Sequence, residues 1–133
     1  MSRQSGTNIL LFSNRVEIKP ISVNQAWQGR KFKSPIYKEY EKECLYKLPA
    51  HKINWIGEPI ELSLVVGLSN MASDVDNVVK PFVDILQKKY GFNDKFIFRL
   101  IVEKKIVAKG AEFIEFYIKR LVPRHYILDF SEE

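Results

Sequence analysis

Hydrophobic residues along the chain follow two different repeats, and each repeat predicts a different kind of element. Apolar and polar residues alternate over 15–19, which predicts a strand that ends at Pro20. The apolar run from Ile9 to Phe12 has two interpretations, an extra strand or a pairing arm. Segment 59–68 begins with alternation and then becomes wholly apolar, which is typical of a central strand with a buried face.

Two other segments show the helical repeat. Apolar residues recur every four positions between Ser34 and Pro49, where serine is a suitable N-cap and Pro35 suits the first turn. The predicted apolar positions of this helix are Ile36, Tyr37, Tyr40, Cys44, Leu45 and Leu48. A second helix is predicted from the segment that follows Asp76, despite a proline at position 81 that indicates a local irregularity.

Projecting this second helix at about 100° per residue separates two faces. The polar face carries Asp76, Asn77, Lys80, Asp84 and Gln87. The apolar face carries Val75, Val79, Phe82, Val83, Leu86 and Tyr90. Asp76 and Lys80 therefore lie one turn apart on the same side.

Two further segments, 96–103 and 112–119, are rich in β-branched and aromatic residues and flank a turn at Lys109-Gly110. We predict that they pair as an antiparallel hairpin. The order of elements is then β-α-β-α-β-β, which predicts an α/β (α+β) fold with two main helices on a mixed sheet.

Length and composition fit one domain. The 133 residues, 46% of them hydrophobic, can bury a core without disulfides, and the only cysteine, Cys44, is interpreted as a small buried residue. We assign 1–133 to a single domain with its core at about 15–120, an N-terminal arm over 1–14 and a C-terminal extension over 123–133. Apolar runs are too short for a membrane span or a signal peptide, so we expect a soluble, cytoplasmic protein without a membrane partner.

Charge favours a polyanionic partner. The formal net charge is +5, with 21 Lys and Arg against 16 Asp and Glu. The cations are spread over several clusters, and one of them, Arg30, Lys31 and Lys33, lies in a loop punctuated by glycine and proline. Such side chains can follow a phosphate backbone, although a solvated surface loop has the same composition.

The candidate catalytic residues lie in and beside the second predicted helix. Asp74 and Asp76 are one residue apart, Lys80 follows on the same face, and Asp94 comes after a glycine turn. Mg²⁺ prefers oxygen ligands, lowers the pKa of bound water and neutralises charge on a phosphate. We therefore predict that Asp74, Asp76 and Asp94 bind metal. Lys80 would be a fixed cation that stabilises the transition state or orients the water.

Each acidic residue also has a purely structural interpretation. Asp76 could be only a helix N-cap, Asp94 only a turn residue and Asp74 a solvated loop acid. Asp84 lies on the polar face too. We interpret it as a helix acid paired with a lysine four residues away, either Lys80 or Lys88.

Two motifs occur together in a fixed order. The first is Pro-x-Ser-x-Asn at 20–24, and the second is Asp-x-Asp-Asn-x-x-Lys at 74–80 with the later Asp94. Together they resemble the RusA family of Holliday-junction resolvases, over residues 15–120. Many members of that family carry paired aspartates where this chain has Asn93-Asp94.

The resemblance implies a RusA-like fold and an endodeoxyribonuclease that acts in DNA recombination and repair. It implies a Mg²⁺-dependent homodimer that resolves four-way DNA junctions by paired nicks. On the matching positions, Asp74, Asp76 and Asp94 would bind metal and Lys80 would be the essential lysine. The predicted DNA contacts are Asn24, Arg30, Lys31, Lys33, Asn77 and Lys80.

Other functions stay open at this point. A nuclease for flaps or other branched DNA would share the same residues, and so would a non-catalytic DNA-binding protein of the same fold. The extension at 123–133 has apolar residues beside acids. It is interpreted either as a docking peptide for a replication or repair protein or as a segment that packs back onto the domain.

Overall fold

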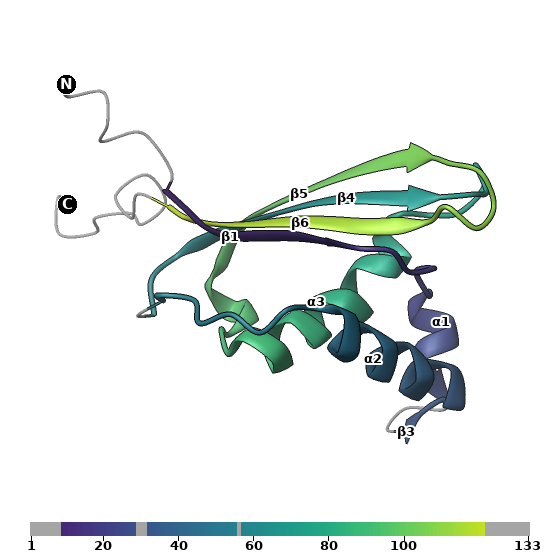
Figure 1. Cartoon of the computed structure of the whole chain (residues 1–133), viewed down its shortest axis with the longest axis horizontal. Coiled ribbons are helices and arrows are strands. Elements are labelled where there is room, and N and C mark those ends of the chain that lie inside the picture. Colours follow the sequence, from purple (N-terminus) through teal and green to yellow (C-terminus); the bar gives the residue numbers. More distant parts are fainter. Residues whose placement is uncertain (1–8, 29–31, 56, 122–133) are drawn as a thin grey trace, which may run out of the picture.

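The computed structural model describes residues 9–28, 32–55 and 57–121 of the chain. Its elements, in order, are β1 (Ile9–Val16), α1 (Val23–Ala26), β2 (Trp27–Gln28), β3 (Phe32–Lys33), α2 (Pro35–Lys47), β4 (Ile60–Leu68), α3 (Asp76–Tyr90), η2 (Asp94–Phe96), β5 (Ile97–Ile106) and β6 (Phe113–Arg120). Strands β1, β6, β4 and β5 form a mixed sheet in that order, while β2 pairs only with β3. Helices α2 and α3 lie on one face of the sheet, as Figure 1 shows. The predicted fold class is confirmed.

Strand β4 is central because both of its edges and its inner face are covered. It pairs in parallel with β5 and antiparallel with β6, so that Leu64 lies between Val102 and Phe116. Leu62, Leu64 and Val66 are each at most 1% exposed, as a strand under helices requires. The central strand predicted from the apolar run is therefore confirmed.

The predicted hairpin between the last two strands is wrong. β5 and β6 are not neighbours, because they pair with opposite edges of β4. Helix α3 is a crossover that brings β5 back in parallel beside β4, and this leaves the other edge of β4 for β6. The connection crosses the end of β4, where the Val107 N–H donates to the Leu68 carbonyl at 2.9 Å. Composition identified the two strands but could not identify their neighbours.

The first strand lies earlier in the chain than its alternation predicted. β1 covers Ile9–Val16, so the apolar run at its start is the extra strand, and the segment 17–19 lies outside it. Alternation continues past the strand because Ile18 is buried in the core while its neighbours are exposed. The backbone of residues 17–19 has no part of β6 left to pair with, because β6 begins at Phe113 and Val16 already pairs with Ile114.

Helix α2 begins as predicted, with one change in its buried face. The Ser34 Oγ accepts a hydrogen bond from the Tyr37 N–H at 3.1 Å, and proline occupies the first turn. Tyr37, Tyr40 and Cys44 are buried, whereas Ile36 is 52% exposed and does not belong to the apolar face. The apolar face of α2 therefore starts at Tyr37, one residue later than the spacing predicted.

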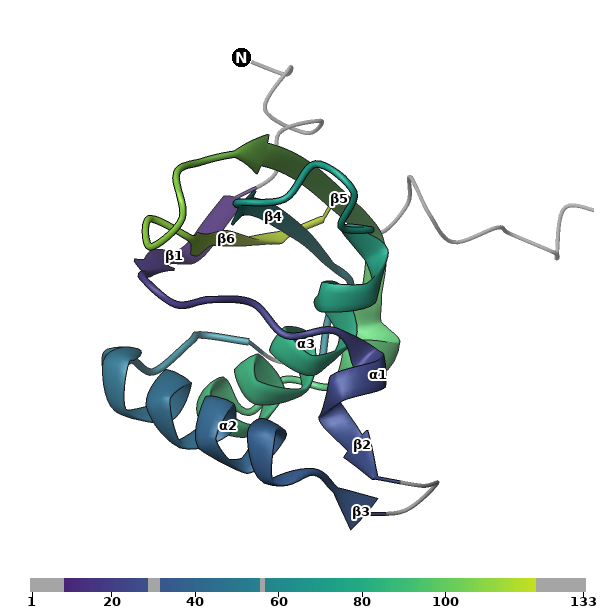
Figure 2. The same cartoon turned by 90° about the vertical axis from the view of Figure 1, so that its right-hand side faces the viewer.

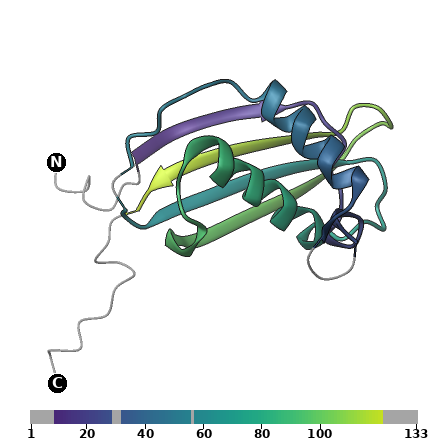
Figure 3. The same cartoon turned by 90° about the horizontal axis from the view of Figure 1, so that it is seen from below.

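Helix α3 packs along the inner face of the sheet, as Figure 3 shows from the helix side. Phe82 is fully buried against Phe116 of β6, with ring centroids 5.9 Å apart. Pro81 is buried inside the helix, which continues to Tyr90 without a break, as predicted. Within the described residues, no helix has the length and apolar character needed to cross a membrane.

Candidate active site

A short loop connects β4 to α3 and carries Asp74 at its end. The loop is closed by the Ser73 N–H, which donates to the Asn70 carbonyl at 3.1 Å, and by the Asn70 Oδ1, which accepts from the Ala72 N–H at 2.8 Å. The Lys104 Nζ of β5 donates to the Met71 carbonyl at 2.8 Å and to the Ser73 carbonyl at 2.6 Å. Strand β5 therefore holds the loop that precedes Asp74.

Replacing Lys104 with methionine is expected to loosen this loop, because two charge-assisted hydrogen bonds are lost while the apolar stem is kept. We expect amide hydrogen exchange at Ala72 and Ser73 to become at least about tenfold faster, and the free energy of unfolding to fall by about 1–3 kcal/mol. Hydrogen exchange followed by mass spectrometry or NMR measures both. Lys105→Met is the matched control, and equal exchange in the two variants would contradict this role.

Asp76 is the first residue of α3, and its carboxylate does not cap the helix. The N-cap is Val75, and the cap makes no side-chain hydrogen bond. The interpretation of Asp76 as a helix N-cap is therefore wrong. Within the described residues, no hydrogen bond or ion pair reaches the carboxylate of Asp76 or that of Asp74, so both are available to a ligand.

Asp94 is placed by the turn that ends α3. Gly91 has φ +79°, a left-handed conformation that glycine adopts without strain, and its N–H donates to the Gln87 carbonyl at 2.8 Å. The Gln87 Oε1 accepts from the Asp94 N–H at 2.8 Å. Asn93 caps η2, because its Oδ1 accepts from the Lys95 N–H at 3.0 Å. The Asp94 carboxylate is therefore not needed for the turn.

Lys80 reaches two carboxylates across the polar side of α3. Its Nζ lies 2.9 Å from the Asp84 Oδ1 and 3.4 Å from the Asp94 Oδ2. Hydrogen bonding to Asp84, with a further contribution from Asp94, raises the pKa of Lys80 above its usual value. The predicted pairing of Asp84 with a lysine four residues away is confirmed. Lys80 is thus a cation at neutral pH, oriented by two carboxylates.

A cavity of about 420 Å³ lies between α3 and β5, and we call it the α3–β5 cavity. Its polar side chains are Asp76, Lys80 and Asp94. Its apolar lining residues are Val75, Val79, Val83, Ile97, Leu100 and Val102. The structure thus brings three of the four predicted catalytic residues to one cavity, and apolar walls there strengthen interactions between charges.

A second cavity, of about 590 Å³, lies on the other side of the loop, and we call it the α1–α3 cavity. Asp74 lines it together with Asn24 and Asn77, two of the predicted DNA contacts. Lys19 and Lys109 also line it, although neither belongs to a predicted site. Figure 2 shows why these segments meet, since α1 lies beside the first turn of α3. Lys19 and Lys109 lie in connections outside the strands, so only the tertiary structure places them beside Asp74.

The three aspartates are not gathered into one cluster. Asp74 lines the α1–α3 cavity, whereas Asp76 and Asp94 line the α3–β5 cavity. In the part of the chain that the structure describes, no group of three or more acidic, histidine or cysteine side chains could hold a metal ion. The donor chemistry still fits Mg²⁺, which is commonly bound through one or two carboxylates, with water and substrate phosphate completing its shell.

The predicted basic loop is described only in part. Arg30 and Lys31 lie outside the described residues. The Lys33 Nζ lies 3.4 Å from the Glu41 Oε2 and 5.0 Å from the centre of the Tyr37 ring. Lys33 is thus held against α2, on the side of the molecule where α1 and the β2–β3 pair lie.

A protein-family model matches most of the chain. The model described as endodeoxyribonuclease RusA matches residues 17–116. Comparison with curated proteins gives no significant match. The RusA family comprises divalent-metal-dependent endonucleases of Holliday junctions. Because the matched segment covers most of the chain and contains all four predicted catalytic residues, the protein belongs to the RusA family of endodeoxyribonucleases.

Proposed function

We propose that this endodeoxyribonuclease is a Mg²⁺-dependent homodimer that resolves four-way DNA junctions by paired nicks beside the crossover. The observation that carries the proposal is the arrangement of Lys80 and Asp76. A fixed cation stands in a cavity beside a carboxylate that has no partner among the described residues. Metal-assisted hydrolysis of a phosphodiester needs both charges. The carboxylate provides a site for the ion, and the lysine provides a cation for the phosphate.

The carboxylates of Asp74, Asp76 and Asp94 would together bind the Mg²⁺ ion. Asp76 and Asp94 face one cavity, and Asp74 lies two residues before Asp76 on the loop held by Lys104. When bound, Mg²⁺ lowers the pKa of an attacking water and neutralises charge on the phosphate. Asp74 would have to move with its loop to join the other two carboxylates.

Lys80 would bind the scissile phosphate. An ammonium group has three N–H donors, and Asp84 and Asp94 account for two of them in this structure. The third donor can point to a non-bridging phosphoryl oxygen. Because Lys80 is already oriented by its ion pairs, little reorganisation is needed when negative charge grows on that oxygen.

The α1–α3 cavity would hold DNA next to the cut. Its side-chain amides, from Asn24 and Asn77, can bond to phosphate or to base edges, and Lys19 and Lys109 add positive charge. Lys33, with Arg30 and Lys31 beside it in sequence, would extend the contact along the backbone. Two cuts related by the symmetry of a four-way junction require two such sites, hence a dimer.

One observation favours a second candidate function. Because the three aspartates are separate, the chain could also act as a non-catalytic DNA-binding protein of the same family. In that case Lys33 would matter for binding, and Asp74 and Lys80 would be dispensable.

Incubating the purified protein with four-way, flap and linear duplex DNA, with Mg²⁺ and with EDTA, tests the proposal. We expect cleavage of the four-way junction in Mg²⁺ alone, at two symmetric positions. If flaps are cleaved more strongly than four-way junctions, the substrate is another branched DNA and not the four-way junction. Binding without cleavage of any DNA would favour the non-catalytic function.

A further inference from the structure

Strand β5 is an open edge of the sheet. It is 10 residues long, it pairs with β4 on one side, and no described residue pairs with its other side. Leu100, Ile101 and Ile106 are 49%, 39% and 49% exposed along it. Figure 3 shows β5 running the full length of the sheet at its border. A long edge with exposed apolar side chains is a template for pairing with another strand.

The residues of β5 are complementary to a second copy of the same strand. When identical strands pair antiparallel, a two-fold axis runs through the centre of the ladder, and residues that face each other lie on the same side of the sheet. With the axis at Ile101, Arg99 faces the partner's Glu103 on both sides of the axis. Leu100 faces the partner's Val102, and the two Ile101 side chains meet.

Neighbouring registers are poorer. With the axis at Val102, Arg99 would face the partner's Lys105, and like charges opposite each other are destabilising. With the axis at Leu100, Arg99 would face the partner's Ile101, and the ladder would be shorter because β5 begins at Ile97. Glu103 has no hydrogen bond or ion pair to any described residue, whereas Arg99 lies 3.6 Å from Glu61. The register centred on Ile101 therefore gives Glu103 its cationic partner.

We propose that the outer edge of β5 is the homodimer interface, with two copies of the strand paired antiparallel about Ile101. The two sheets then become one continuous sheet, and both sets of helices lie on the same face of it. Val102 and Leu100 line the α3–β5 cavity, so the two cavities stand symmetrically beside the axis. The interface rests on the proposed function in one respect, because paired cuts are the reason for expecting a dimer.

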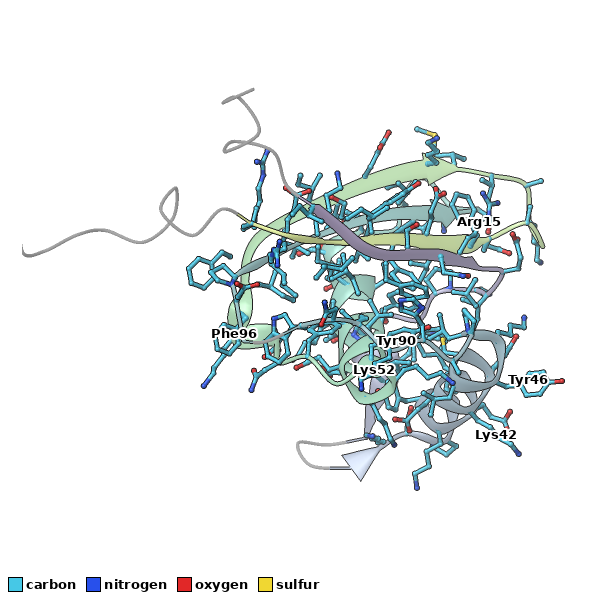
Figure 4. All side chains as sticks on the ribbon, turned by 60° about the vertical axis from the view of Figure 1, so that its left-hand side comes forward. Arg15, Lys42, Tyr46, Lys52, Tyr90 and Phe96 are labelled. Atoms are coloured by element: carbon cyan, nitrogen blue, oxygen red, sulfur yellow. The ribbon has the colours of Figure 1, made fainter. Side chains whose placement is uncertain are left out.

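Disulfide trapping tests the interface. Cα atoms that face each other across an antiparallel pair are about 4.5–5.5 Å apart, within the range that a disulfide spans. Cys44 is fully buried and burial raises the pKa of its thiol to about 12, so it should not compete. Tyr46→Cys is the matched control, because Tyr46 is 88% exposed on α2 and points away from the molecule in Figure 4.

We expect Ile101→Cys to form covalent dimers in diamide at least about tenfold faster than Tyr46→Cys. Equal rates would overturn the interface. In analytical ultracentrifugation, Arg99→Glu and Glu103→Arg should each be monomeric, while the double variant should be dimeric again. Continued dimerisation of both single variants would also overturn it. Junction cleavage by the wild type is scored separately, so cleavage without trapping refutes only the interface, and trapping without cleavage refutes only the function.

Discussion

Replacing Asp74 with asparagine is expected to lower the rate of junction cleavage in Mg²⁺ by at least about 1,000-fold. The amide keeps the shape of the side chain but removes the negative charge that a metal ion needs. The Asp74 carboxylate has no hydrogen bond or ion pair to the other described residues, so the fold should be unaffected. Affinity for the junction should change by no more than about threefold, because cations supply most of the binding energy.

Single-turnover cleavage and gel-shift binding on the same labelled junction measure these two effects separately. Glu39→Gln is the control, because Glu39 is also an exposed acid without a described partner, but it lies on α2. It should cleave at the wild-type rate. A normal rate in Asp74→Asn would show that Asp74 is the solvated loop acid of the structural interpretation, and would leave the metal to Asp76 and Asp94.

The second large effect is expected at Lys80. Lys80→Met keeps most of the stem but removes the cation, and we expect cleavage to slow by about 100- to 1,000-fold. Since Asp84 and Asp94 raise its pKa, Lys80 stays charged throughout a neutral or mildly alkaline assay. The wild-type rate should therefore show no loss from deprotonation of this lysine at neutral or mildly alkaline pH.

Lys88→Met is the matched control for Lys80. Both lysines are on α3 and both pair with an acid, since the Lys88 Nζ lies 3.1 Å from the Glu41 Oε2. The two variants should have similar stability, because exposed ion pairs contribute little. If both variants cleave junctions equally well, Lys80 is only the ion-pair partner of Asp84.

Helix α3 and its polar face could be predicted because both depend on local sequence. Periodicity placed Asp76 and Lys80 on one side, and the apolar stripe with Phe82 and Leu86 on the other. The glycine turn before Asp94 was also local, since Gly91 adopts a positive φ that suits a helix end. These elements needed no information about distant contacts.

Contacts between strands could not be predicted in the same way. The composition of β5 and β6 suits a hairpin as well as two strands on opposite sides of β4, and only the crossover through α3 decides between them. That error also concealed the part played by Lys104. Its position beside Val66, facing the helices, follows from the register of β5 on β4.

The spatial arrangement of the three aspartates could not be predicted from the sequence either. Their order in the sequence suggests that Asp74 and Asp76 act together, whereas the structure places Asp76 with Asp94 at the α3–β5 cavity and Asp74 at the α1–α3 cavity. Lys80 lies at the same cavity as Asp76 and Asp94, and its Nζ is 3.4 Å from the Asp94 Oδ2. Sequence spacing predicted the members of the site, whereas their separation became visible only in three dimensions.

The central claim is that the α3–β5 cavity is the active site of a metal-dependent junction endonuclease, and one measurement tests it most directly. Asp76→Asn and wild type are compared in single-turnover cleavage of a four-way junction in Mg²⁺, at concentrations where gel shift shows both fully bound. We predict two symmetric nicks by the wild type and at least about 1,000-fold slower cleavage by the variant. Equal cleavage by the two proteins would contradict the claim.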